Sequence, residues 1–386
     1  MIVMTESPSH RTARHRIGRI QGSRPGPSAV FVAGMHGNEP SGVEGVRRVL
    51  ARMEAEGIDP RGDVIGLAGN LAALEARRRF LAQDLNRLWV RREIDAIRDG
   101  APEDLSVPED RERRELLTLL HEEFDRARGP VLVLDLHTAS SQTAPFIVFG
   151  DTLRNRRFAR SFGAPMILGL EEELTGTLME YVTGLGHISM VFEAGQHEDP
   201  VAADHQESVV WMALETHGCL EPSQIPDYRV HRARVRSGAE GVPQILEIFK
   251  RHAIAPEDRF IMKPGYRNFQ RVRRGEVVGQ DRTGPITVSD NSLLFLPLYQ
   301  GLGSDGFFLA RSVNPVWLAV STWLRRFGAA NVVARLPGVR PHPKLAATLL
   351  VDRRIARFLA PQIFHLLGYR VRTVGASTLE VKRRED

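Results

Sequence analysis

A histidine and a glutamate three residues apart, His36 and Glu39, lie where an apolar stretch ends and a helical pattern begins. The glycines beside His36 permit a tight turn, so both side chains can point toward one place. An imidazole nitrogen and a carboxylate oxygen are both ligands that zinc takes in proteins. The pair also has an alternative explanation. The two polar residues could simply begin a helix, with Glu39 interacting with the positive end of the helix dipole.

A second histidine, His137, ends the apolar stretch that begins at Val131 and contains Asp135. Open α/β sheets place their sites outside the carboxyl ends of the strands, which makes His137 a candidate third ligand. Catalytic zinc usually has three protein ligands and keeps a fourth position for water. Asp135 lies on the same side of the strand, so it either orients a ligand or is an ordinary acceptor at the strand end.

Two further motifs carry polar groups. Arg79, Asn86 and Arg87 share a loop in which guanidinium groups could hold a carboxylate and an oxyanion, and a surface arginine cluster is the alternative. Glu193 ends another apolar stretch. It is a candidate general base for the attack of metal-activated water on an amide, and a capping or ion-paired glutamate is the alternative.

In order and approximate spacing, these four motifs resemble the succinylglutamate desuccinylase/aspartoacylase family, which is similar in fold to the zinc carboxypeptidases. The resemblance is good over residues 28–220 and looser as far as Val313. It implies one zinc ion per chain, bound by His36, Glu39 and His137. It also implies a β-rich second domain that partly covers the site.

The same resemblance assigns roles to the remaining residues. It implies that Glu193 activates the zinc-bound water and then passes the proton to the leaving amine. Arg79 would polarise the scissile carbonyl, while Asn86 and Arg87 would hold the substrate carboxylate. The function implied is a zinc-dependent hydrolase that cleaves a C–N amide bond of an N-acyl amino acid or a related small amide.

One stretch departs from the family pattern. Aspartoacylases carry an arginine about ten residues before the base, where it binds the side-chain carboxylate of the substrate. Here the stretch from Met179 to Gly186 has Thr183 near that place and no arginine. Because a threonine cannot form a bidentate charged pair, we expect a substrate other than N-acetylaspartate.

The elements that must position these residues alternate between strands and helices. Apolar runs predict strands at 28–34, 64–68, 131–137, 146–149, 166–170 and 188–193, and helical spacing predicts helices at 39–57, 108–127 and 201–217. This alternation predicts a doubly wound, mostly parallel α/β sheet, zinc carboxypeptidase-like, as a catalytic domain over residues 1–222.

After residue 222 the pattern of predicted secondary structure changes. We predict a β-rich domain over residues 223–313, which begins with a helix at 242–252 and continues as short strands between glycine turns. Residues 314–386 read as a basic helical extension, with helices at 316–327 and 352–367. They hold 13 Lys and Arg against 4 Asp and Glu, a net of +9, so the other 313 residues carry −4 of the total of +5.

The composition indicates where the protein is located and which partners it has. The single cysteine, Cys219, excludes a disulfide framework within the chain, and no apolar run is long enough to span a membrane. With no apolar leader at its start, the chain is expected in the cytoplasm. The expected partners are a small N-acyl amino acid or amide and a second copy in a homodimer. Nucleic acid is not expected, and the net positive charge comes from the extension.

Polar residues near the expected base suggest a second metal. They are His197, Asp199, Asp204 and His205, and we favour structural or rim roles for them. His187 is expected to be an ordinary core or edge histidine. Cys219 has no neighbouring base motif in the sequence, so we do not expect it to be a catalytic nucleophile.

Two other functions remain open from the sequence. A zinc carboxypeptidase that acts on short peptides would use the same catalytic residues, although a covering second domain would exclude long peptides. A non-catalytic protein that binds anions through its basic extension is the alternative from another class. The complete set of His36, Glu39, His137 and Glu193 argues against loss of catalysis.

Overall fold

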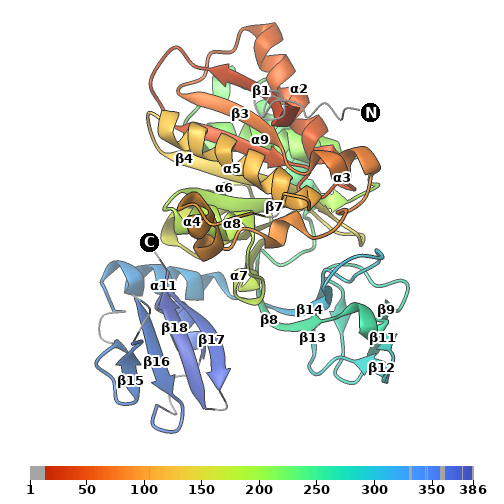
Figure 1. Ribbon diagram of the computed structural model, residues 1–386, viewed down its shortest axis with the longest axis vertical. Coiled ribbons are helices and arrows are strands. Elements are labelled where there is room, and N and C mark those ends of the chain that lie inside the picture. Colours follow the sequence, from red (N-terminus) through yellow and green to blue (C-terminus); the bar gives the residue numbers. More distant parts are fainter. Residues whose placement is uncertain are drawn as a thin grey trace.

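A sheet of eleven strands forms the centre of the molecule (Figure 1). The computed structural model describes residues 14–103, 105–329, 333–343, 345, 347–356, 361–375 and 377–384. In spatial order the strands are β1 (Arg16–Gln21), β3 (Asp63–Ala68), β2 (Ser28–Ala33), β4 (Val131–Ala139), β7 (Ile188–Gln196), β5 (Phe146–Phe149), β6 (Met166–Leu168), β8 (Ile245–Ala253), β14 (Asp305–Ser312), β13 (Ser292–Phe295) and β10 (Arg271–Val272). From β1 to β8 the pairing is mostly parallel, which confirms the predicted sheet.

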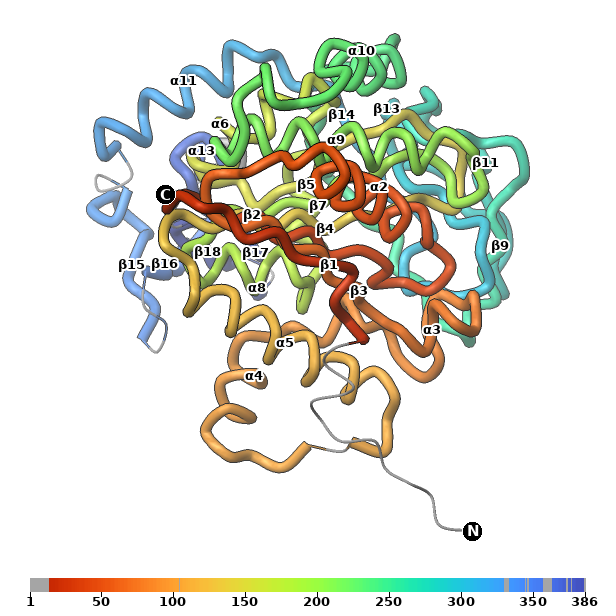
Figure 2. The backbone as a smooth tube through the Cα atoms, turned by 90° about the horizontal axis from the view of Figure 1, so that it is seen from above, coloured from red at the N-terminus to blue at the C-terminus, as the bar shows by residue number. Residues whose placement is uncertain are grey.

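Helices cover both faces of the parallel part, as Figure 2 shows from above. They are α2 (Ser41–Glu56), α3 (Leu71–Ala76), α4 (Arg91–Arg98), α5 (Pro108–Arg126), α6 (Leu153–Ser161), α7 (Leu170–Glu173), α8 (Leu178–Gly184), α9 (Ala202–His217) and α10 (Tyr228–Gly238). In β2, Ala29, Phe31 and Ala33 pack toward α2 and α9, while Val30 and Val32 pack toward α5 and α8. The strand is therefore apolar along its whole length because both of its faces are buried. No helix among the described residues has the length and apolar content of a membrane span.

Residues 242–252 differ from the prediction. The spacing of Ile245, Ile248 and Phe249 suits a helix, yet this segment forms strand β8. β8 lies between β6, to which it is parallel, and β14, to which it is antiparallel. Partners that are distant in the sequence therefore decide its structure, and local spacing does not reveal them.

The β-rich part grows out of the same sheet. β9 (Ile261–Met262), β11 (Val277–Asp281) and β12 (Gly284–Thr287) form a separate three-stranded antiparallel sheet. It packs against β10, β13 and β14 through a core that includes Met262, Val278 and Leu294. Because β8, β14, β13 and β10 extend the central sheet, the sheet continues across the predicted domain boundary at residue 222.

The last part of the chain, residues 314–384 as described, is called the C-terminal unit below. Its helix α11 (Pro315–Arg326) was predicted. Of the expected helix at 352–367, residues 352–356 are not helical, residues 357–360 lie outside the described residues, and α13 (Pro361–Leu366) is a helix. The unit is also not only helical. An antiparallel sheet runs in the order β15 (Val339–Pro341), β16 (Thr348–Asp352), β18 (Thr378–Arg383) and β17 (Tyr369–Gly375). Buried Leu349 and Val351 face Val381 and Leu379 across it, a pairing between distant segments.

Candidate active site

The parallel register brings the predicted site residues to one edge of the sheet. His137 on β4 is paired with Glu193 on β7, and Ala33 at the end of β2 is paired with the residue before His137. The loop that follows β2 carries His36 and Glu39 over this edge. A Cβ on Gly37 would lie 2.0 Å from the carbonyl oxygen of Ala73, so only glycine allows the loop to pass so close to α3.

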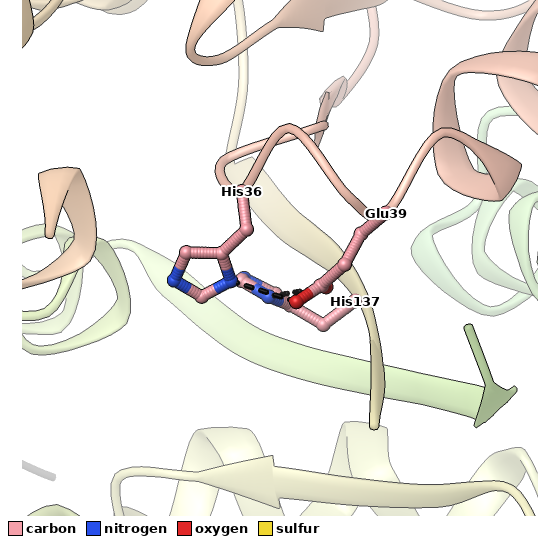
Figure 3. A group of neighbouring side chains, drawn as sticks. All are labelled: His36, Glu39 and His137. Carbon is pink, nitrogen blue, oxygen red and sulfur yellow. Dashed lines mark hydrogen bonds and ion pairs between the residues drawn. The ribbon is translucent and has the colours of Figure 1, made fainter. Parts of the chain in front are cut away.

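Three buried side chains converge above the strand ends (Figure 3). One ligand atom from each of His36, Glu39 and His137 lies within 4.8 Å of the others, and this is the only such group among the described residues. The Nδ1 atom of His36 is 2.8 Å from Glu39 Oε1, and the Nδ1 atom of His137 is 3.1 Å from Glu39 Oε2. The backbone N–H of Thr138 also donates to Glu39 Oε2, at 2.9 Å.

A carboxylate lies behind each imidazole. The Nε2 atom of His36 is 3.1 Å from Asp84 Oδ1, and that of His137 is 2.9 Å from Asp135 Oδ2. Histidines that bind metals commonly donate their other ring N–H to a carboxylate, which fixes the tautomer and orients the ring. Of the two roles considered for Asp135, the contact with His137 favours that of an orienting residue.

The charges around the three side chains favour a cation. Burial alone would raise the pKa of Glu39, but the His36 and His137 imidazoles hold it well below its usual range. Burial lowers the pKa of His137, yet Asp135 and Glu39 raise it well above its usual value. Two nitrogen donors and one carboxylate, braced by two more carboxylates, fit the ligand chemistry of zinc.

Glu193 lies beside this group without a strong partner. Among the residues described, no group is hydrogen-bonded to its buried Oε2 atom. Removal from bulk water raises the pKa of Glu193 to about 8, with Glu39 and Asp135 adding to the effect and His137 and Arg79 opposing it. A carboxyl group with a pKa close to neutrality can both take up and release a proton at this place.

The polar loop reaches the same cavity. The Arg79 guanidinium donates to Asp84 Oδ2 at 3.0 Å and lies 3.8 Å from Glu39 Oε1. Asn86 accepts a hydrogen bond from the backbone N–H of Leu178, which leaves its Nδ2 atom 3.5 Å from His137 Nε2. These two residues and Arg87 line the cavity, so the alternative of a surface arginine cluster does not describe them.

The cavity has about 140 Å³ and two unlike ends. The polar end contains the metal-ligand candidates, Glu193 and the loop residues. The apolar end is formed by six lining side chains that share one hydrophobic cluster: Val148, Leu170, Leu174, Met179, Val191 and Phe308. Thr183, which stands near the sequence position of the family's substrate-binding arginine, does not line the cavity and packs near the backbone of Gly150.

The other polar residues after the base have structural contacts. Asp204 pairs with Arg48 at 3.0 Å, and the ring of His205 is 2.8 Å from the carbonyl oxygen of Ala194. His197 lines the cavity, where its ring lies 2.8 Å from the Thr138 hydroxyl. These contacts agree with the structural and rim roles that we expected.

Sequence reasoning missed two features of the site. Asp84 was seen only as a neighbour of Asn86, although it contacts both His36 and Arg79. The apolar wall formed by α7 was also missed, because Leu170 was taken as the end of the predicted strand at 166–170. For Asp84, its place two residues before Asn86 in the same loop was the available signal.

The catalytic region of the chain is similar to a known protein family. Residues 25–213 match the model of the "Succinylglutamate desuccinylase/Aspartoacylase catalytic domain". This region belongs to the succinylglutamate desuccinylase/aspartoacylase family. The family match confirms the resemblance that the motifs suggested.

Sequence relatives and solved structures agree with the family match. A succinylglutamate desuccinylase of Pseudomonas paraeruginosa is 32% identical over 114 residues, which are 30% of this chain and 32% of that protein. The match thus spans about a third of the length of that relative. A crystal structure of a succinylglutamate desuccinylase/aspartoacylase from Rhodobacter sphaeroides has a TM-score of 0.56 at 18% identity, covering 78% of this chain and 88% of that one.

A second solved structure shows how much of this chain lies outside the shared fold. For the succinylglutamate desuccinylase from Chromobacterium violaceum the TM-score is 0.53 at 15% identity. The match covers 99% of that chain but 80% of this one. At such identities the two structures show a common fold, and about a fifth of this chain has no counterpart in the second of them.

Proposed function

We propose that this chain is a zinc-dependent hydrolase that cleaves the C–N amide bond of an N-acyl amino acid or a related small amide. The convergence of His36, Glu39 and His137 beside the unpartnered carboxylate of Glu193 carries the proposal. These three residues would hold one zinc ion per chain. The chemistry that zinc supplies is to polarise a carbonyl group and to make water nucleophilic at neutral pH.

Glu193 acts as the proton carrier in this proposal. Its place opposite His137 in the register puts the carboxylate next to the metal ligands, within the cavity that would hold the scissile amide. It takes a proton from the attacking water as the C–O bond forms. It then gives that proton to the amine nitrogen as the C–N bond breaks.

The loop residues bind and polarise the substrate. Arg79 is held by Asp84, so its guanidinium is fixed beside Glu39 and can stabilise the negative charge that develops on the carbonyl oxygen. Asn86 and Arg87 bind the substrate carboxylate, since a guanidinium and an amide N–H both donate to such a group. The contact of Arg87 with Asp305 on β14, at 3.4 Å, links this subsite to the β-rich part.

The remaining assignments are proposals as well. Cys219 is free and buried, which suits the reducing cytoplasm, and we propose that location. We also propose a homodimer, which light scattering on the purified protein would test. No nucleic-acid partner is part of the proposal.

A hydrolysis screen tests the proposed reaction. The purified zinc-loaded protein is offered N-acetyl and N-succinyl amino acids beside short unblocked peptides, and released amine is measured. We expect turnover of one or more N-acyl amino acids, with none by Glu193→Ala. Hydrolysis of the peptides alone would establish the carboxypeptidase alternative, and no hydrolysis of either class would contradict both.

A further inference from the structure

The short helix α7 separates two cavities. Leu170, Glu171 and Leu174 line the apolar end of the catalytic cavity. The neighbouring residue Glu172 lines a second cavity, of about 530 Å³, between the catalytic body and the C-terminal unit. α7 and the residue after it are thus a thin wall between the two cavities. Figure 1 shows α7 at the side of the catalytic body that faces the C-terminal unit.

Four residues are too few for a helix that is stable by itself. The carbonyl groups at the end of such a helix also need partners outside it. In this structure Arg251 on β8 donates to the carbonyl oxygen of Glu173 at 2.9 Å, and the C-terminal unit supplies further partners. Arg370 donates to the carbonyl oxygens of Glu171 and, at 3.3 Å, Leu174, and it pairs with Glu180 on α8.

Arg384 binds the side chains of the wall from the same direction. Its guanidinium contacts Glu171 at 3.0 Å, Glu172, and Asp151 at 3.2 Å. The side chain of Arg384 is only 9% exposed, so these charged contacts are shielded from water. His365 of α13 adds a contact of 3.1 Å to Glu172. Removing one member of a buried ion pair leaves the other charge buried without a partner, so such a substitution destabilises the protein.

We propose that the C-terminal unit is a positioning element of the active site, in which Arg384 and Arg370 hold α7 and thereby shape an apolar subsite for the substrate. This rests on the proposed function for the reaction itself. Leu170 and Leu174 form the subsite with Met179, and Arg370 also fixes the α8 segment that carries Met179, through Glu180. An apolar substrate group would bury surface against these leucines.

The test compares Arg384→Ala and Arg370→Ala with Arg372→Ala. Arg372 is an exposed arginine on the same strand as Arg370, so it controls for the loss of one positive charge from the unit. Each zinc-loaded full-length variant is assayed on substrates with a small or a bulky apolar group, first in the acyl chain and then in the amino acid. We expect KM for the bulky members to rise about tenfold in the two test variants, with kcat and zinc content nearly unchanged.

Hydrogen exchange supplies a readout that does not depend on turnover. Amides of residues 168–176 should exchange faster in Arg384→Ala and Arg370→Ala than in Arg372→Ala, because the wall has lost its support. If the wild-type protein hydrolyses no amide, the proposed function fails, and exchange still decides whether the unit holds α7.

Three outcomes would overturn the proposal. They are unchanged exchange in α7, unchanged KM in a folded Arg384→Ala protein that is otherwise active, and equal effects of all three substitutions. If the Arg384→Ala protein does not fold, the same measurements are made on Arg384→Lys and Arg370→Gln. Lysine keeps the charge but not the fork that reaches two carboxylates, so it should give a smaller change in the same direction.

Discussion

The two ends of the catalytic cavity are built in different ways. At the metal end, the ligand candidates come from the loop after β2 and from the neighbouring parallel strand β4, and each of the two histidines is braced by a carboxylate. At the α7 end, the wall is held by arginines about 200 residues further along the chain. Chemistry is thus set by short motifs at strand ends, while the shape of the apolar subsite depends on distant contacts.

Loss of a ligand at the metal end should have the largest effect. His36→Ala removes one of three protein ligands, so the purified variant should contain far less than one zinc per chain. Turnover should fall by at least about a thousandfold, because several kcal/mol of transition-state stabilisation are lost. Metal analysis and assay check both. His187→Ala, which changes a histidine packed on Phe124, should keep its zinc, and stoichiometric zinc in His36→Ala would disprove the ligand assignment.

Loss of the base should separate chemistry from metal binding. Glu193→Gln keeps the size of the side chain but cannot carry the proton, so kcat should fall by about 10²–10⁴-fold while zinc content stays the same. Glu198→Gln, a nearby exposed carboxylate, is the matched control. A Glu193→Gln protein with wild-type kcat would show that the base lies elsewhere.

Substitution of Asp135, which contacts the ligand candidate His137, should have a weaker effect than loss of a ligand or of the base. Asp135→Asn removes the negative charge behind His137, so zinc affinity should fall by about 10–100-fold. Competition with a coloured chelator measures this affinity. An unchanged affinity would mean that Asp135 is an ordinary strand-end acceptor, the alternative that the sequence left open.

The smallest effect concerns the α7 end and depends on pH. Although burial opposes it, the contacts of His365 with Glu172 and Glu247 raise its pKa to about 9, and Arg384 is the opposing cation nearby. Because the folded pKa lies above the unfolded value of about 6.5, the contribution is complete below pH 6.5 and is lost as pH rises toward 9. It amounts to at most about 3 kcal/mol.

Thermal unfolding from pH 6 to pH 9.5 measures this contribution. The wild-type Tm should fall over that window more steeply than the Tm of His365→Gln, which has lost the titrating group. Parallel curves would show that His365 does not couple the C-terminal unit to the body through its charge.

The metal end was largely predictable from the sequence, and the α7 end was not. Strand β4 and the segments around His36 and Glu193 have local patterns strong enough to predict both their structure and their meeting at one sheet edge. β8 was missed because pairing with distant strands overrides its helical spacing, and β16 was missed because it is paired with a distant segment of the chain. The contacts of Arg370 and Arg384 with α7 have no local pattern at all, since they depend on where the last strands fold back.

Titration of the metal-free protein with zinc tests the central claim most directly. The protein is stripped with a chelator and zinc is restored in steps, while release of amine from an N-acyl amino acid is followed. We expect activity to rise in proportion to added zinc and to stop rising at one ion per chain. Full activity without metal, or no activity at one zinc per chain with any N-acyl amino acid tested, would contradict the account.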